Sequence, residues 1–101
     1  MNSVTIAVDL AKHVFEIALS PEPGRITERR RMSRTQFERY WSSRAPCRVV
    51  MEACAGAHFW GRRLQGLGCE VTLLPPHYVR AYVRRNKTDR SDCEALLEAD
   101  R

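Results

Sequence analysis

The chain has 101 residues, of which 44% are hydrophobic and 29% charged, so it is long enough for one globular domain and too apolar for wholesale disorder. Its net charge of +5, carried mostly by arginine, suits a polyanionic partner, because one guanidinium donates two hydrogen bonds to a phosphate. The apolar stretches are far shorter than a membrane span and the chain opens without a signal peptide, so we expect a cytoplasmic protein with no membrane partner.

Three strand-like segments come first. Residues 4–8 form a nearly continuous apolar run, which is typical of a central strand covered on both faces, and the run ends at Asp9. Residues 15–19 alternate between apolar and other side chains and predict a half-buried second strand. After a turn at residues 21–24, residues 25–32 predict a third strand that is too polar for anything but a sheet edge. The short connections predict an antiparallel meander.

Helices and strands then alternate. Ser33 and Gln36 fit a capping box at the start of a helix whose aromatic residues share one face. Residues 48–51 predict a short buried strand that ends in Glu52. A turn of small residues at 53–57 leads into a second helix.

The last part of the chain completes the predicted sheet. Gly68 is placed to end the second helix, residues 70–74 predict a fifth strand, and Thr88 or Asp89 would cap a helix still in progress at the last residue. The predicted class is α/β with a ribonuclease H-like mixed five-stranded sheet: an antiparallel meander plus parallel strands, with flanking helices, truncated in the last helix. The first and fourth strands would be parallel neighbours, and residues 1–101 would form one domain.

Four acidic residues converge in this topology. Asp9 and Glu52 end the first and fourth strands, and parallel neighbours place such residues together in the crevice beyond the strand ends. Asp89 and Asp92 are three residues apart at a helix start, so both point from one face. Such a cluster repels itself unless it holds a divalent cation, and oxygen ligands favour Mg²⁺ or Mn²⁺. Singly, each acid also fits a turn, a cap or the helix dipole, and only their joint placement favours a metal site.

Three segments carry a resemblance to a known family. Residues 7–15, 50–53 and 87–95 resemble the DEDD transposases of insertion sequence family one-hundred-ten, which includes the Piv-type DNA invertases. The pattern Lys-Thr-Asp-x-x-Asp in the third segment is the most specific part of the match. The resemblance covers the whole chain but only the N-terminal, RuvC-like domain of that family. Cys93 stands where the family often has alanine, which affects packing more than chemistry.

The resemblance implies a fragment of a DNA transposase or recombinase, an enzyme that breaks and joins DNA strands with metal held by catalytic acids. By motif position these acids are Asp9, Glu52, Asp89 and Asp92. In the family, a serine of a second domain attacks DNA, and an RNA encoded by the element pairs with donor and target DNA. That serine-bearing domain is absent from residues 1–101, so we expect this chain alone to be inactive. The implied partners are DNA, a guide RNA and, in the full-length protein, further copies in a homo-oligomer.

Basic residues accompany the acids. We expect nucleic-acid contacts from one lysine after the first strand and from a tyrosine-interleaved group that leads into the last helix: Lys12, Arg80, Arg84, Arg85, Lys87 and Arg90. A solvated positive loop that offsets the acids is the alternative for that group. A second group lies on the predicted edge strand, far from the crevice, and we interpret it as a charged edge that discourages association between sheets: Arg29, Arg30, Arg31 and Arg34.

Three other functions fit parts of the pattern. Actin-like sugar kinases share the opening meander, but they need glycine-rich turns beside the first aspartate, and the segment after Asp9 has none. A stand-alone RuvC-like nuclease would use the same four acids, although the Lys-Thr-Asp-x-x-Asp pattern disfavours it. A non-catalytic nucleic-acid-binding remnant would keep the charge without the chemistry, and titration with a divalent metal separates it from a transposase domain.

Overall fold

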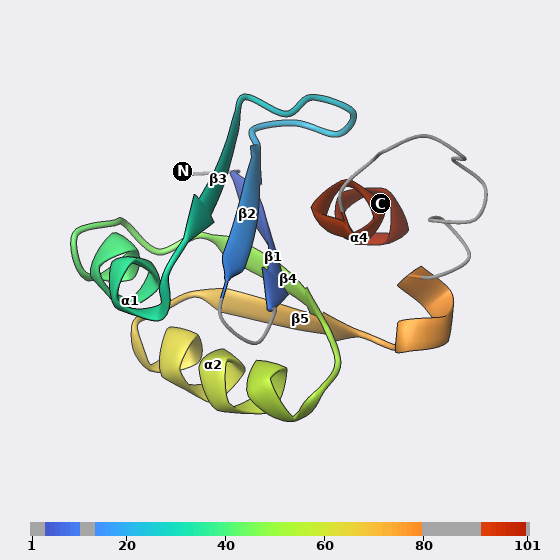
Figure 1. Ribbon diagram of the computed structural model, residues 1–101. Coiled ribbons are helices and arrows are strands. Elements are labelled where there is room, and N and C mark those ends of the chain that lie inside the picture. The colour runs from blue at the N-terminus through green and yellow to red at the C-terminus, as the bar shows by residue number, and fades with distance from the viewer. Residues whose placement is uncertain (1–3, 11–13, 80–91, 101) are drawn as a thin grey trace.

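The computed structural model describes residues 4–10, 14–79 and 92–100. Within these ranges, one five-stranded sheet has helices on both faces (Figure 1). No helix in the described ranges is long and apolar enough to cross a membrane. Residues 76–79 form a helical turn after the last strand. In chain order the other elements are β1 Thr5–Leu10, β2 Phe15–Ser20, β3 Glu28–Met32, α1 Arg34–Ser42, β4 Arg48–Glu52, α2 Ala55–Gly66, β5 Glu70–Leu74 and α4 Asp92–Asp100.

The sheet has the order β3-β2-β1-β4-β5. β1 pairs antiparallel with β2, and β2 pairs antiparallel with β3, which is the predicted meander. β4 lies parallel to β1 and β5 lies parallel to β4, and each of these strands follows a helix in the chain. The predicted α/β class and mixed five-stranded sheet are confirmed, and the arrangement is compatible with a ribonuclease H-like fold.

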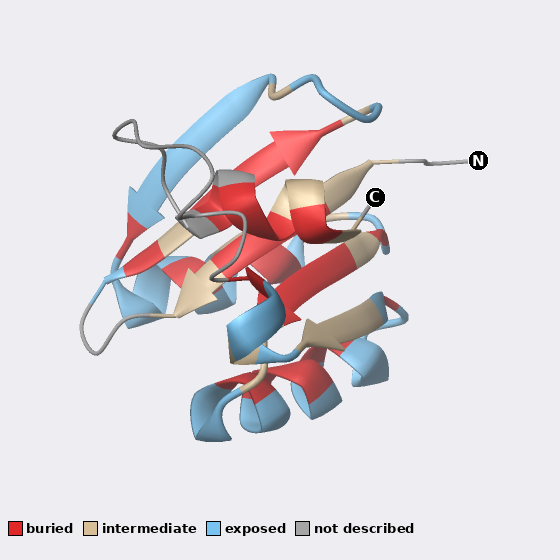
Figure 2. Cartoon of the chain, turned by 90° about the vertical axis from the view of Figure 1, so that its right-hand side faces the viewer, coloured by how far each residue is buried: buried red, intermediate tan, exposed pale blue. Residues whose placement is uncertain are grey.

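The two faces of the sheet are packed differently. The face toward α1 and α2 is filled by large side chains, including an aromatic cluster of Phe15, Phe37, Trp41 and Trp60 whose paired ring centroids lie 4.6–5.7 Å apart. Figure 2 shows the central strands buried and β3 exposed along most of its length, as expected of an edge strand. The face toward α4 is lined by the smaller side chains of Ala7, Ala18 and Val50. α4 packs on them through Cys93 and Ala95, which are also small, so this helix lies close to the sheet.

Local sequence signals fix two helix ends. In the predicted capping box, the Gln36 N–H donates to the Ser33 hydroxyl at 3.2 Å, and the Ser33 N–H donates to the Gln36 side chain at 2.9 Å. Gly68, with a φ of 95°, follows α2. Its N–H and that of the next residue return to the carbonyls of Gln65 and Leu64, at 3.0 Å each, which is a Schellman ending.

Two other boundaries differ from the prediction. β3 begins at Glu28 instead of residue 25, because the Arg25 N–H donates to the Glu22 carbonyl at 3.1 Å and lengthens the turn before the strand. Arg34, predicted on this edge strand, is instead the first residue of α1, because the Ser33 cap starts the helix directly after β3. α2 begins at Ala55, inside the segment predicted as a turn. There the Cys54 sulfur accepts a backbone N–H at 3.4 Å and caps the helix, a role that sequence analysis did not assign to a cysteine.

Candidate functional site

Asp9 and Glu52 lie on neighbouring strands that run in the same direction. β1 and β4 pair in parallel register up to the residues just before these two acids, so the acids come level on adjacent strands. Ala7 and Val50, two residues earlier on each strand, face α4, and strand alternation places both acids on that same face. Adjacent strands lie about 4.8 Å apart. The prediction that this pair would lie on parallel neighbours is confirmed.

The position of Asp9 within its strand differs from the prediction. β1 does not end at the aspartate but continues to Leu10, because Asp9 pairs with Glu16 and Leu10 pairs with Phe15 across the hairpin. Asp9 is therefore inside a paired strand, where the pleat fixes the direction of its side chain.

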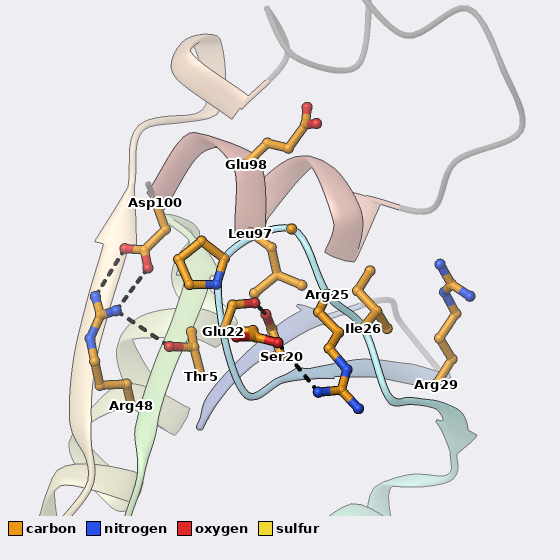
Figure 3. Close-up of a pocket in the computed structure, with 12 residues that line it drawn as sticks. Thr5, Ser20, Glu22, Arg25, Ile26, Arg29, Arg48, Leu97, Glu98 and Asp100 are labelled. Atoms are coloured by element: carbon orange, nitrogen blue, oxygen red, sulfur yellow. Dashed lines mark hydrogen bonds and ion pairs between the residues drawn. The ribbon is translucent and has the colours of Figure 1, made fainter. Parts of the chain in front are cut away.

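Helix α4 runs across this face with its N-terminal end toward the acids. Near that end, the Cys93 thiol lies 3.3 Å from the Glu16 carbonyl and 3.6 Å from the Ala7 carbonyl. At the other end, two nitrogens of Arg48 contact the two carboxylate oxygens of Asp100 at 3.0 and 3.1 Å (Figure 3). Asp92, the first residue of α4, is thereby brought to the end of the sheet that carries Asp9 and Glu52.

Two residues outside the predicted site join the same row: Glu16, and Arg31, which was wrongly predicted to lie far from the crevice. Strand register places Asp9 opposite Glu16, and Glu16 opposite Arg31. All three are on the face toward α4, and the Arg31 guanidinium is 3.5 Å from the Glu16 carboxylate. We call Glu16, Asp9 and Glu52 the carboxylate row. The alternation of residues 15–19 contained the signal for Glu16, but only the hairpin register shows which residue it faces.

The carboxylate row concentrates negative charge at one end of the sheet. Like charges level on neighbouring strands repel one another, which destabilises the sheet. Arg31 offsets part of this charge at the β3 edge of the row. Carboxylate oxygens are the kind of ligand that a hard divalent cation prefers. Among the side chains that the structure describes, no group of three or more His, Cys, Asp or Glu is placed to hold a metal ion.

The other predicted site residues fall outside the described side chains. Asp92 has a described backbone, as the first residue of α4, but its side chain is not described. The rest lie in the ranges 11–13 and 80–91, for which the structure gives no description: Asp89, Lys12, Arg80, Arg84, Arg85, Lys87 and Arg90.

A cavity of about 560 Å³ lies at the far end of α4 from the carboxylate row, between this helix and the β2–β3 connection (Figure 3). Two of its arginines are engaged by acids that also line it. Arg25 contacts Glu22 at 3.3 Å, and Arg48 contacts Asp100 at 3.0 Å. The cavity is therefore lined by charges of both signs, and the Arg48–Asp100 ion pair at its edge connects α4 to the sheet.

The thiols are packing and capping groups. All four cysteines are free, and Cys47, Cys69 and Cys93 are buried. Burial, reinforced by the neighbouring Cys69 sulfur, raises the pKa of Cys47 to about 11. Cys47 is therefore a protonated thiol near neutral pH and is a poor nucleophile or metal ligand. Cys54, the cap of α2, is exposed.

Comparisons with known proteins identify relatives of this chain, although no family model matches it. It is 42% identical over 98 residues to the transposase for insertion sequence element IS1328 of Yersinia enterocolitica, covering 97% of this chain and 29% of that protein. It is 40% identical over 99 residues to a probable family 20 transposase of Pseudomonas aeruginosa, with 98% and 29% covered. It is 40% identical over 94 residues to the transposase for insertion sequence element IS1111A of Coxiella burnetii, with 93% and 26% covered.

The fold and the paired acids define an α/β domain compatible with the ribonuclease H-like class. At 34–42% identity over nearly its whole length, this chain is homologous to transposases of insertion sequence elements, which is consistent with the resemblance to family one-hundred-ten. The chain spans less than a third of the length of these curated relatives.

Proposed function

We propose that residues 1–101 are the RuvC-like domain of a DEDD transposase of insertion sequence family one-hundred-ten. The domain supplies a divalent-metal site for DNA strand breakage and joining. One observation carries the proposal: Asp9 and Glu52 come level on parallel neighbouring strands, on the face that α4 crosses from Asp92. The homology to insertion-sequence transposases supports DNA as the substrate.

The donor set of the proposed site is Asp9, Glu52, Asp89 and Asp92. Carboxylate oxygens fit Mg²⁺ or Mn²⁺, and these ions would balance a charge that the strand pairing otherwise concentrates. When bound, such an ion stabilises the charge that develops on phosphate oxygens during strand transfer. The protein's own part is to hold the acids in place: the pleat of β1 and β4 directs two of them, and the packing of α4 positions the helix that begins at Asp92.

The remaining parts of the reaction lie outside these residues. We propose that the nucleophilic serine belongs to a second domain and that the chain alone does not recombine DNA. We propose too that a guide RNA and further copies of the full-length protein complete the assembly. Lys12 and the basic group preceding α4 would contact nucleic acid, through Arg80, Arg84, Arg85, Lys87 and Arg90. The relatives are more than three times as long as this chain, which leaves room for such a domain.

Calorimetric titration of the 101-residue chain with Mn²⁺ tests the metal site. We expect binding by the wild type and at least tenfold weaker binding by Asp9→Asn and by Glu52→Gln. Glu38→Gln, which neutralises an exposed acid on α1, is the matched control and should leave the affinity unchanged. Equal affinity in all four proteins would overturn the proposal. Binding of nucleic acid without any metal binding would instead favour a non-catalytic remnant.

DNA cleavage assays separate the two enzymatic alternatives. The full-length transposase with Mg²⁺ and element-end DNA should form a covalent protein–DNA product, and the 101-residue chain should not. Cleavage of branched DNA by the short chain alone would show a stand-alone RuvC-like nuclease and would contradict the division of labour proposed here.

A further inference from the structure

A second charged surface lies on the face of the sheet opposite the carboxylate row. Between the exposed edge strand β3 and the end of α1 there is a groove of about 620 Å³. The groove is lined by three arginines and a tyrosine, Arg30, Arg39, Arg44 and Tyr40, together with Gln36 and Ser43. None of its described lining residues is acidic. We call this surface the arginine groove.

Strand alternation explains how the groove acquires one arginine of β3. Arg29 and Arg31 point to the face of α4, where one lines the cavity beside α4 and the other contacts Glu16. Arg30 points the opposite way, to the face on which Met32 packs with α1. The run of consecutive arginines is thus divided between two surfaces, and the charged edge predicted from the sequence is only part of its arrangement.

Tyr40 forms the centre of the groove. The guanidinium carbon of Arg44 lies 4.8 Å from its ring centroid and that of Arg30 lies 5.5 Å from it. A guanidinium that lies over an aromatic ring is held in place while its N–H groups can still donate at the edges. Two forked donors are therefore arranged around one ring, with Arg39 beside them on α1.

The charge of the groove is poorly neutralised by the protein. Arg30 has an ion pair with Glu28 at 3.8 Å, but both side chains are more than two-fifths exposed, and such pairs contribute little. Among the described residues, neither Arg39 nor Arg44 forms an ion pair with a carboxylate. This differs from the cavity beside α4, where acids meet the arginines. Gathered cations of this kind attract a polyanion.

We propose that the arginine groove binds the phosphodiester backbone of a nucleic acid. The site is separate from the carboxylate row and does not depend on bound metal. Phosphate is the chemistry that fits, because forked guanidinium donors match its oxygens two at a time. Gln36 and Ser43 also line the groove and add neutral donors, the amide N–H groups of Gln36, whose oxygen serves the capping box, and the Ser43 hydroxyl. The contact reads no base sequence, since backbone phosphates carry none.

Fluorescence anisotropy tests the proposal with the 101-residue chain in EDTA, so that failure of the metal site cannot affect the result. Labelled single-stranded RNA, single-stranded DNA and duplex DNA of equal length distinguish the possible sources of the phosphodiester. The groove variant is the triple substitution Arg30→Gln, Arg39→Gln and Arg44→Gln. The control removes the same charge from exposed sites elsewhere: Arg25→Gln, Arg62→Gln and Arg63→Gln.

We expect the groove variant to bind at least one of the three nucleic acids tenfold more weakly, and the control to change affinity less than threefold. For a single strand, loss of three phosphate contacts should reduce the slope of log affinity against log salt by about 2. Equal losses of affinity in both variants would show that binding depends only on net charge and would overturn the proposal. Equally tight binding of polyglutamate by the wild type would overturn the assignment to phosphate.

A measurement on the unmodified protein covers the case in which the triple variant does not fold. In NMR spectra of the arginine side chains, the Nε–H signals of Arg30, Arg39 and Arg44 should shift on addition of the bound oligonucleotide. Those of Arg62 and Arg63 should remain in place. Shifts confined to the second pair would contradict the proposal.

Discussion

The contact between Arg48 and Asp100 offers a sharp test of how α4 is held on the sheet. The two side chains meet through two nitrogen–oxygen contacts, at 3.0 and 3.1 Å, and the Asp100 side chain is only 11% exposed. We predict that Asp100→Asn, which keeps the shape and removes the charge, destabilises the fold. A hydrogen bond to a charged group contributes about 1.5–3 kcal/mol. Because Arg48 is 40% exposed and solvent screens it, we expect the lower end, about 1.5 kcal/mol.

Thermal unfolding followed by circular dichroism, at neutral pH without metal, measures this effect. In a domain of this size, about 1.5 kcal/mol corresponds to a lowering of Tm by about 6–12 °C. Glu38→Gln removes the same charge from an exposed position on α1 and should change Tm by less than about 4 °C, since substitutions at such sites change stability by less than about 0.5 kcal/mol. A double-mutant cycle with Arg48→Met should give a coupling energy of about 1 kcal/mol. Equal Tm values for Asp100→Asn and Glu38→Gln, or no coupling, would refute the reasoning.

Three further predictions concern charge, burial and protonation. Glu52→Gln should stabilise the metal-free fold by about 0.2–1 kcal/mol, because it relieves repulsion in the carboxylate row, and a fall in Tm of several degrees would show that Glu52 is a structural partner. Tyr40→Phe should leave the unfolding free energy unchanged or raise it by about 1 kcal/mol, since the Tyr40 hydroxyl is buried without a hydrogen-bond partner among the described residues; denaturant titration that shows a clear loss would reveal a partner. The unfolded chain loses the Cys47 proton near pH 9 while the folded chain keeps it to about pH 11, so stability should fall by up to about 2–3 kcal/mol as pH rises through this window. Cys47→Ala should lack that part of the pH dependence, and identical slopes for the two proteins would contradict the assignment.

Elements with a strong local pattern were predictable from the sequence. The apolar run before Asp9 and the one before Glu52 were correctly assigned to the two central parallel strands. The capping box at Ser33 and the glycine ending at Gly68 were also predictable, because each depends on residues within one helical turn.

Features that depend on register or on distant contacts were not predictable. Glu16 faces Asp9 only because of the register in which β1 and β2 pair, and the sequence of residues 11–14 contains no turn motif that specifies this register. The β3 arginines are divided between two faces by strand alternation, and the pairing of β3 with β2 decides which face each one takes. Arg48 and Asp100 are 52 residues apart, and only the path of α4 across the sheet brings them together.

Because the side chains beneath α4 are small, the position of this helix relative to the acids is sensitive to larger residues in the sheet. Ala7 and Ala18 are completely buried between the sheet and this helix, and the Cys93 sulfur rests on the Ala7 carbonyl. A valine or leucine at either position would clash with the helix and push α4 away from the sheet, which would also move Asp92 away from Asp9 and Glu52. We therefore expect that a chain with all its acids but a bulky residue at position 7 or 18 would lack the metal affinity that we propose for the site.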